Sequence, residues 1–295
     1  MILERKIPIG YILGKIKIDL LVVVVFSTAT SLLSSYLQDL NIPVTIGAFL
    51  GTAIALILSF KLSQSYDRWW EARKIWGAIV NDSRTFVLQL KHFSKNPESA
   101  LISRMAYRQM SWCYALGANL RGLKINTEED PFLEELERQL LKDRIHIPLA
   151  LLDNHSADLN TLHREDQLND FQQVQIDSTL LRLCASMGKA ERIKNTSFPK
   201  TYRLTLHLFI YIFLVMLSFS LTELTGFIEI PLLVFISVPF FLLEKIALNI
   251  QDPFENRPTD TAMTSIARTI ERNIRELLKE EDIPEPLKPE KFYMQ

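Results

Sequence analysis

Long apolar runs alternate with polar stretches along this chain. Residues 20–38 and 40–60 are two uncharged, mostly apolar runs separated only by Asp39, and residues 204–222 form a third. An α-helix needs about 20 apolar residues to cross the hydrocarbon core of a bilayer. The pattern therefore predicts three membrane spans, of which the first two form a helical hairpin with its turn at Asp39.

A fourth apolar run, residues 230–243, is shorter and contains Pro231 and Pro239. Two interpretations are open for this segment. Either the span borrows residues 224–228 across Glu229, or its helix is broken and protected by neighbouring protein, because a broken helix inside a membrane must satisfy its backbone groups there.

Basic residues predict the orientation of these spans, since Lys and Arg in short flanking segments stay on the cytoplasmic side. They flank the open ends of both predicted hairpins and are absent from the two connecting turns: Arg5, Lys6, Lys15 and Lys17; Lys61, Arg68, Arg73 and Lys74; Arg192, Lys194, Lys200 and Arg203; and Lys245. The chain is thus predicted to be a multi-pass protein of the cell membrane with both termini in the cytoplasm. A cleaved signal peptide ending near Ser35 is the alternative, but its apolar run would exceed the usual ~7–15 residues.

The polar stretch between the hairpins lacks the alternation of a strand and predicts helices. We expect them over residues 67–93, 99–120, 128–142 and 166–193, and a last one over residues 263–279. The first of these has an expected inner stripe of Trp70, Ile75, Ile79, Phe86 and Leu90. The fold class is therefore all-α, with four transmembrane helices and a helical cytosolic domain.

This pattern divides the chain into four parts. Residues 1–62 hold an N-terminal cytosolic segment and the first hairpin, residues 63–203 the helical cytosolic domain, and residues 204–244 the second hairpin. Residues 245–295 form a C-terminal cytosolic helix and a proline-rich tail, which is expected to be an extended strap or disordered from Asp282 onward.

Composition excludes several classes of protein. A count of 33 Lys and Arg against 34 Asp and Glu gives a formal net charge of −1, without the basic excess that nucleic-acid binding requires. The mean hydropathy of +0.09 suits neither a purely soluble nor a purely membrane chain, so the apolar residues must be segregated. Cys113 and Cys184 are too few for a disulfide framework and are expected to be reduced, buried thiols.

Sequence motifs for catalysis are absent, since the chain has no glycine-rich phosphate loop, no His-Glu-x-x-His and no Gly-x-Ser-x-Gly. We therefore expect neither an enzyme nor a cofactor. The nearest approach to a metal cluster is interpreted as a solvated loop, so no metal site is expected there: Asp153, His155, Asp158, His163, Glu165 and Asp166. His207, near the cytoplasmic end of a span, is interpreted as a hydrogen-bonding residue, with a transport role as the alternative.

The second span places Thr52, Leu56 and Phe60 on one helical face. Its many small residues fit close packing against other helices, which is one interpretation. In the other, several copies of this helix surround a pore whose narrow part is ringed by Leu56 and Phe60, a hydrophobic constriction that gates by excluding water. Because one copy cannot line a channel, a pore requires a cyclic homo-oligomer. Other residues lie beside this face: Thr45, Phe49, Ser59 and Ser63.

An ordered motif follows this span, namely Ser65-Tyr66-Asp67-Arg68-Trp69-Trp70-Glu71-Ala72-Arg73 and then Trp76-Gly77. Its composition is that of an interfacial belt of aromatic and Arg side chains. Its order, after a glycine-rich second span, resembles the bestrophin family of ion channels, and the short chain resembles the bacterial members. Glu191-Arg192-Ile193 before the third span and Asp252-Pro253-Phe254 after the fourth fit the same family.

The resemblance implies a homopentameric channel in the lipid bilayer, with one axial pore lined by the second helix of each subunit. It maps the family's hydrophobic neck to Thr52, Leu56 and Phe60, where Thr52 replaces a bulky apolar residue, and the lower cytosolic constriction to Phe171. The expected cargo is small monovalent anions such as chloride, conducted passively. A cation channel of the same family and a non-conducting membrane scaffold are the alternatives.

Eukaryotic bestrophins carry a run of acids after Asn-Pro-Phe that binds Ca²⁺. The corresponding run here is Glu255-Asn256-Arg257-Pro258-Thr259-Asp260, in which a cation and a proline replace carboxylates. Only Asp260 remains as an expected oxygen ligand, whereas Ca²⁺ takes about 6–8 oxygens. We therefore expect no Ca²⁺ site.

Overall fold

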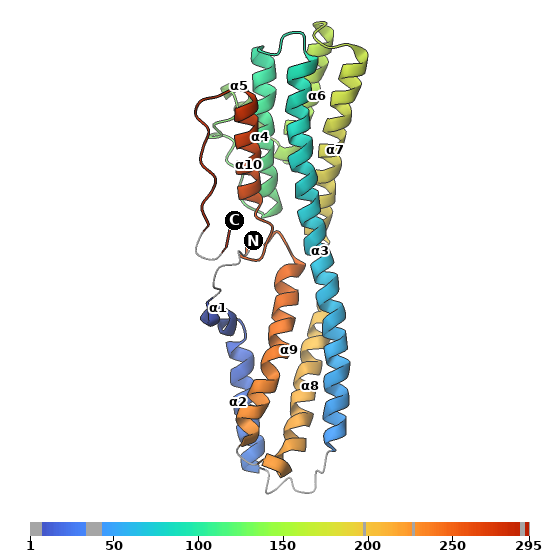
Figure 1. Ribbon diagram of the computed structural model, residues 1–295, viewed down its shortest axis with the longest axis vertical. Coiled ribbons are helices and arrows are strands. Elements are labelled where there is room, and N and C mark those ends of the chain that lie inside the picture. The colour runs from blue at the N-terminus through green and yellow to red at the C-terminus, as the bar shows by residue number, and fades with distance from the viewer. Residues whose placement is uncertain (1–7, 34–42, 197–198, 226–227, 290–292, 295) are drawn as a thin grey trace. The chain divides into compact units, whose positions relative to one another are not determined.

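The computed structural model describes residues 8–33, 43–196, 199–225, 228–289 and 293–294, and all its regular elements are helices (Figure 1). The predicted turn at Asp39 and the flanking Arg5 and Lys6 lie outside the described residues. The described chain forms two compact units, which we call the apolar unit and the polar unit. The apolar unit comprises Glu4–Trp69 and Ser197–Asp252, and the polar unit contains Trp70–Thr196 and Pro253–Gln295.

The apolar unit contains α1 (Ile9–Gly14), α2 (Lys17–Leu33), the N-terminal part of α3 (Val44–Phe93), α8 (Lys200–Thr225) and α9 (Glu229–Gln251). Its core lies where α2, α8 and α9 pack together, and it includes Val23, Ile210 and Leu233. Among the described residues, three helices are long and apolar enough to cross a membrane: Val44–Phe93, Thr201–Leu221 and Glu229–Gln251. The described part of α2 has 17 residues.

The fourth predicted span is one continuous helix, and neither interpretation from the sequence was right. α9 does not borrow residues 224–228, and it is not broken at Pro239, which lies inside the helix. It gains its length at the other end, where it continues past the charged pair Glu244 and Lys245 to Gln251. Burial explains this extension, since Glu244 is only 2 % exposed and is paired with His207 of α8.

The polar unit contains the C-terminal part of α3 together with α4 (Ala100–Leu120), α5 (Glu135–Leu141), α6 (Ile147–Arg164), α7 (Asp170–Asn195) and α10 (Met263–Leu277). α4 lies at its centre, in contact with α6, α7 and α10 (Figure 1). Side-chain caps begin two helices: the Ser99 side chain accepts the N–H of Ile102 at the start of α4, and Asn169 and Gln172 form a capping box at α7, which begins at Asp170 and not at residue 166 as expected.

One predicted helix and one predicted loop differ from the observed structure. The helix expected over residues 128–142 is only α5, because the Asp130 carboxylate accepts the N–H of Phe132 and the hydroxyl of Ser111, which folds residues 130–132 into a turn. The stretch read as a solvated loop is α6, in which His155 is fully buried and Asp158 nearly so. The helix was not predicted because this stretch contains many polar residues. Its buried apolar face includes Leu151, Leu159 and Leu162.

The expected inner stripe of α3 is correct except at its first member. Ile75, Ile79, Phe86 and Leu90 are buried, but Trp70 is 46 % exposed, and Trp76 is the fully buried tryptophan instead. Gly117 of α4 lies beside this ring, where a Cβ atom would be in ordinary van der Waals contact with Cη2 at 3.8 Å. Of the two free cysteines, Cys113 is buried but Cys184 is only half-buried.

A buried ionic cluster joins α4, α5 and α6. Arg108 donates to Glu137 at 2.5 Å and to Asp158 at 2.7 Å, and Arg104 donates to Asp158 at 2.7 Å. Two guanidinium groups thus meet two buried carboxylates, and Arg104 also lies 3.7 Å from the exposed carboxylate of Glu134. A buried ion pair is tolerated only with such complete pairing, because a single buried charge costs several kcal/mol.

Beside this cluster, His155 is fully buried with its ring edge-on to Phe86, the ring centroids 4.8 Å apart. Within the described part of the chain, neither ring nitrogen has a hydrogen-bond partner. Burial, assisted by the charge of Arg108, holds the pKa of His155 well below its usual value. The folded protein therefore keeps this ring neutral, whereas the unfolded chain protonates it below about pH 6.5.

We expect His155→Leu to stabilise the protein by about 1 kcal/mol at neutral pH, because it removes a buried polar group that has no partner. The gain should increase below about pH 6.5. Only the unfolded wild type binds a proton at this ring, so the stability of the wild type decreases as the pH is lowered. Denaturant unfolding of the detergent-solubilised protein at about pH 5.5 and about pH 7.5 measures both effects. His163→Leu is the control, because His163 is partly exposed and paired with Asp170. Lower stability of His155→Leu at both pH values would contradict the prediction.

Candidate functional site

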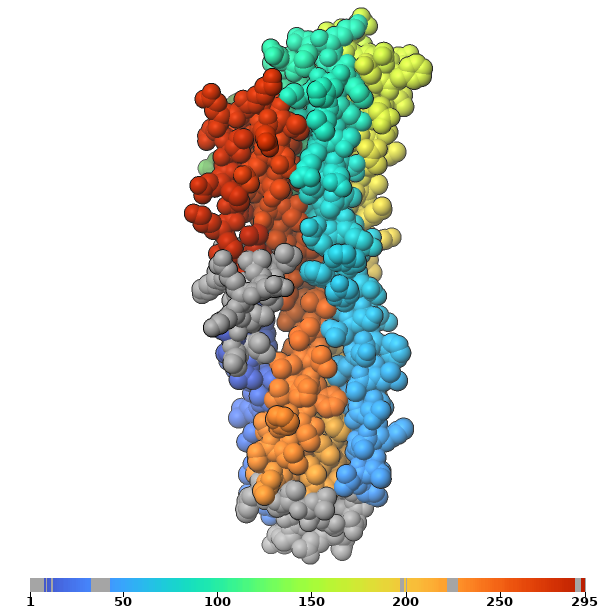
Figure 2. All heavy atoms as spheres, in the orientation of Figure 1, coloured from blue at the N-terminus to red at the C-terminus, as the bar shows by residue number. Residues whose placement is uncertain are grey.

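The three residues predicted to form a neck lie on one exposed face of α3. Leu56 is 58 % exposed, Phe60 is 61 % exposed, and Thr52 is also exposed. The opposite face of the same turns is buried, with Ile54 at 3 % and Leu58 at 1 %. Figure 2 shows the N-terminal part of α3, in light blue, at the surface of the apolar unit. This face of α3 is therefore largely uncovered by the other described residues of the chain.

The exposed face of α3 extends beyond these three residues and mixes apolar and hydroxyl side chains. Phe49 is 73 % exposed, one turn before Thr52, and further residues of the same face are exposed: Thr45, Ser59 and Ser63. The hydroxyl of Thr52 donates to the carbonyl of Ala48 at 2.9 Å, so the methyl group is its outer part. Phe49 was placed beside the neck by the sequence, and its exposure makes it a further member of this face.

The small residues of α3 lie on another face and serve packing within the chain. A Cβ atom at Gly51 would lie 3.0 Å from the Phe213 ring of α8, and one at Gly47 would lie 3.4 Å from Leu217. A spacing of 3.0 Å is too close for most Cβ contacts, so glycine is required for this approach of α3 to α8. The glycines and the predicted neck residues therefore belong to different faces, and packing and pore lining do not compete for the same positions.

The motif after the second span holds α3 in place within each unit. In the apolar unit, Ser65 is buried, Arg68 lies 3.6 Å from Asp252 at the end of α9, and the rings of Tyr66 and Trp69 are 6.0 Å apart. One turn earlier, buried Lys61 donates to Gln251. These contacts join α3 to the C-terminal end of α9, which explains the ordered sequence better than an interfacial belt does.

The remaining motif residues lie in the polar unit. Trp76 is buried, Glu71 pairs with Lys74 at 2.6 Å on the surface, and Arg73 lies beside Gly77, where a Cβ atom would be 3.7 Å from its guanidinium group. The motif thus has structural contacts along its whole length. The exposed residues Thr52, Leu56 and Phe60 come before it in the sequence.

Phe171, the predicted lower constriction, lies in the first turn of α7 and is 88 % exposed. Two further apolar residues of the exposed side of α7, Val174 at 68 % and Leu181 at 69 %, were missed from the sequence. Val174 follows Phe171 by three positions and Leu181 follows Val174 by seven, and this helical spacing would have indicated that they share a face with Phe171. Farther along α7, the Glu191 carboxylate of the Glu-Arg-Ile motif accepts a 2.8 Å hydrogen bond from Nε2 of His146, whose Nδ1 accepts the N–H of Leu149, and this anchors the segment before α6.

The run that corresponds to the eukaryotic Ca²⁺ loop is closed by its own backbone. The Asp260 carboxylate accepts the N–H of Arg257, and the Asp260 N–H donates to the Arg257 carbonyl, both at 3.0 Å. Burial raises the pKa of Asp260. Glu255, the other carboxylate of the run, pairs with Lys194 at 2.8 Å. No group of three or more His, Cys, Asp or Glu side chains that could hold a metal occurs among the described residues.

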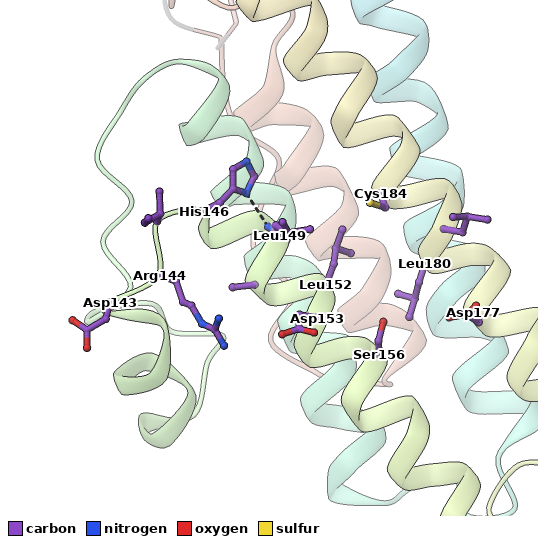
Figure 3. A pocket seen from close by; sticks show the side chains of 13 residues that line it. Asp143, Arg144, His146, Leu149, Leu152, Asp153, Ser156, Asp177, Leu180 and Cys184 are labelled. Atoms are coloured by element: carbon purple, nitrogen blue, oxygen red, sulfur yellow. Dashed lines mark hydrogen bonds between the residues drawn. The ribbon is translucent and has the colours of Figure 1, made fainter.

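A groove of about 750 Å³ lies in the polar unit between α6, α7 and the segment before α6 (Figure 3). Its walls include Leu149, Leu152 and Leu180, and its rim carries Asp153 and Asp177. Ser156 and Cys184 also line the groove, but in the described part of the chain neither hydrogen-bonds a histidine or carboxylate that could activate it. The groove therefore has no arrangement for nucleophilic catalysis.

Comparisons with known proteins identify the class. The family model described as "Bacterial/Fungal Bestrophin protein" matches residues 6–276 of the chain. The voltage-dependent anion channel-forming protein YneE of Escherichia coli K12 is 30 % identical, with 96 % of this chain and 93 % of that protein covered. The relative alr2987 of Nostoc, with the same descriptive name, is 27 % identical over 91 % of this chain and 88 % of its own.

Solved structures agree with these relatives. The crystal structure of a bacterial bestrophin homologue from Klebsiella pneumoniae matches with a TM-score of 0.85 and 26 % identity, covering 90 % of this chain and all of that one. The chain therefore belongs to the bestrophin family, as the motif had suggested. It is an all-α membrane protein of a family of channels, and the family gives no support to an enzyme.

We expect conduction by this protein to be insensitive to Ca²⁺ at the submicromolar to micromolar concentrations that sensor sites detect, because Asp260 is used to close its own turn. Ion flux into liposomes, measured with Ca²⁺ buffered over that range, tests this. Asp260→Asn keeps the acceptor for the Arg257 N–H and is the matched variant. Steep activation by micromolar Ca²⁺ that Asp260→Asn abolishes would show that other oxygens complete a site.

Proposed function

We propose that this protein is a homopentameric channel for passive flux of small monovalent anions such as chloride across the cell membrane. The exposed face of α3, which carries Thr52, Leu56 and Phe60, is the observation that supports it most directly. A ring of five such faces gives an axial pore, and one subunit alone cannot enclose it. In this arrangement four spans cross the membrane and both termini are cytoplasmic.

Two features favour a pore over a surface in contact with lipid. The first is that hydroxyl groups of Thr45, Ser59 and Ser63 alternate with apolar groups on this face, whereas contact with lipid favours an entirely apolar one. The second is that the other side of α3 is already packed against α8 through Gly47 and Gly51. The exposed face is therefore available for copies of the same helix.

Leu56 and Phe60 form the neck of this proposed pore, and Thr52 widens its outer end. Apolar rings of this kind hold no ligands that could replace the hydration shell of an ion, so they impede ions by excluding water. Phe171, exposed at the start of α7, forms the lower cytosolic constriction, with Val174 one turn farther along the same side.

The names of the relatives support anions as the permeant ions, since several are described as voltage-dependent anion channel-forming proteins. A cation-conducting channel of the same fold is the second candidate, favoured by the acidic residues of the outer turns in the sequence. A liposome flux assay with chloride and potassium gradients imposed separately distinguishes the two. A non-conducting scaffold predicts no flux of either ion from an intact oligomer.

We expect single cysteines on the exposed face of α3 to cross-link neighbouring subunits. In a background without the two native cysteines, Thr52→Cys and Leu56→Cys should each give covalent dimers on oxidation, because one thiol per subunit forms one disulfide with one neighbour. Leu58→Cys, on the buried face two residues away, should remain monomeric. Cysteines at positions 52 and 56 that react only with lipid-soluble reagents and never cross-link would place this face toward lipid and contradict the pore.

We expect Phe60→Ala to raise ion flux about tenfold, because a smaller ring of side chains lowers the dewetting barrier by ~1.4 kcal/mol, while ion preference stays nearly the same. Leu58→Ala is the matched control, since it shortens a buried side chain of the same helix. It should cost about 2–5 kcal/mol of stability without raising flux. Flux is compared at equal amounts of intact pentamer. A stable Phe60→Ala pentamer with unchanged or lower flux would remove Phe60 from the neck.

A further inference from the structure

Four ionisable side chains meet inside the apolar unit. They lie on three helices other than α3, the helix that carries the proposed neck. Asp19 lies at the start of α2, His207 on α8, and Glu244 and Lys245 near the end of α9. Asp19 is 6 % exposed and Glu244 is 2 % exposed. Ionisable groups buried among membrane helices are costly, and where they occur they usually have a role.

His207 lies between the two carboxylates. Its Nδ1 atom is 2.9 Å from one Glu244 oxygen and 3.0 Å from the other, and its Nε2 atom is 3.6 Å from Asp19. A neutral imidazole carries one N–H, so one of its nitrogens must turn a lone pair toward a carboxylate. Only the doubly protonated ring is attracted to both acids. The geometry therefore fits an imidazolium.

The charges of the whole cluster lead to the same conclusion. Lys245 of α9 lies 3.3 Å from Asp19, and the hydroxyl of Tyr211 on α8 donates to Asp19 at 3.1 Å. With His207 protonated, two cations face two carboxylates and the buried set is neutral. Loss of the His207 proton leaves a net charge of −1 in a cluster whose two carboxylates are buried and whose His207 and Lys245 side chains are 31 % and 29 % exposed, and this is costly for the carboxylates. Protonation of one residue thus decides whether α2, α8 and α9 are held together by a neutral cluster.

Aromatic contacts connect this cluster to the proposed neck. The His207 ring packs edge-on to Tyr211, with centroids 5.0 Å apart, and Tyr211 packs against Phe241 of α9. Two residues beyond Tyr211 on α8, Phe213 packs against Phe240, which precedes Phe241 on α9, and Phe213 lies against α3 at Gly51, next to Thr52. A change in the packing of α8 on α9 is therefore transmitted to the part of α3 that carries the neck.

We propose that His207 is a proton-binding site through which pH controls the channel. Bound between Asp19 and Glu244, the proton holds α2, α8 and α9 together and keeps α8 pressed against α3. Its release as the pH rises weakens this packing and lets the neck widen, so flux increases on the alkaline side. The stability change depends on the cluster alone, whereas the flux change also rests on the proposed channel function.

The first experiment measures thermal unfolding of the detergent-solubilised pentamer between about pH 6.5 and about pH 9, because below about pH 6.5 the titration of His155 lowers the stability of every variant. The wild type should lose about 2–4 °C of its melting temperature in one step as the pH rises. His207→Gln, which is never charged, should lack the step and stay at the alkaline level. His207→Lys, which stays charged, should also lack the step but stay at the acidic level.

His163→Gln is the matched control, because His163 also faces a carboxylate, Asp170, but on the surface of the polar unit. It should keep the step. A wild type with no step, or a step that His207→Gln retains, would overturn the proton site. If His207→Gln does not assemble, the wild type and His207→Lys still decide the outcome. A step that occurs both in the wild type and in His207→Lys would also overturn the proton site.

The second experiment measures chloride flux into liposomes at both ends of the same pH range. Wild-type flux should be several-fold higher at the alkaline end, and His207→Lys should stay at the low flux of the acidic end throughout. Equal wild-type flux at both ends, with the stability step present, would overturn control of conduction by this site. Absence of flux from wild type and from Phe60→Ala alike would contradict the channel function instead, so the two failures are distinguishable.

Discussion

The structure depends on α3 remaining one unbroken helix from Val44 to Phe93, because this helix takes part in both compact units. Its first turns must pack against apolar helices on one side, which Gly47 and Gly51 permit, and its last turns must bury Phe86 and Leu90 in the core of the polar unit. Neither glycine nor proline interrupts the helix between Gly51 and Gly77. A kink in this region would change the direction of the buried faces at once, so continuity is the constraint that the rest of the chain satisfies.

Packing of α3 also decides which surface is available for function. Buried contacts with α8 and with the end of α9 occupy one side of the helix through Gly51, Leu58 and Lys61. The other side is largely uncovered by the described chain at Leu56 and Phe60, whose side chains are more than half exposed. In an α-helix these two sides are separated by a shift of only one or two residues in the sequence, since each residue turns the helix by about 100°. Small residues and bulky residues in the same span therefore have separate roles.

The two units use similar ionic clusters with different chemical properties. In the polar unit, Arg104 and Arg108 neutralise Glu137 and Asp158. In the apolar unit, Lys245 and His207 face Asp19 and Glu244. Both sets join three helices, and both are neutral only when every base is charged. Arg keeps its charge at all physiological pH values, whereas histidine does not. The first cluster is thus a permanent connection, and the second can change with pH.

Much of the fold could be predicted because local patterns determine it. The uncharged runs that became α3, α8 and α9, and the Ser99 and Asn169 caps, depend on neighbouring residues alone. The ordered motif after the second span identified the bestrophin family for the same reason. The helix α6 was missed because its polar residues look solvated until Arg104 and Arg108 of α4 pair with Asp158.

What only the tertiary structure decided concerns contacts between residues far apart in the sequence. Periodicity placed Thr52, Leu56 and Phe60 on one face but could not say whether α8 covers that face, and the approach of Phe213 to Gly51 decided that it covers another. In the same way, the sequence presented His207 as a single polar residue in a span. Its partners Asp19 and Glu244 are 188 and 37 positions away, so only the folding of α2 and α9 against α8 could bring them to it.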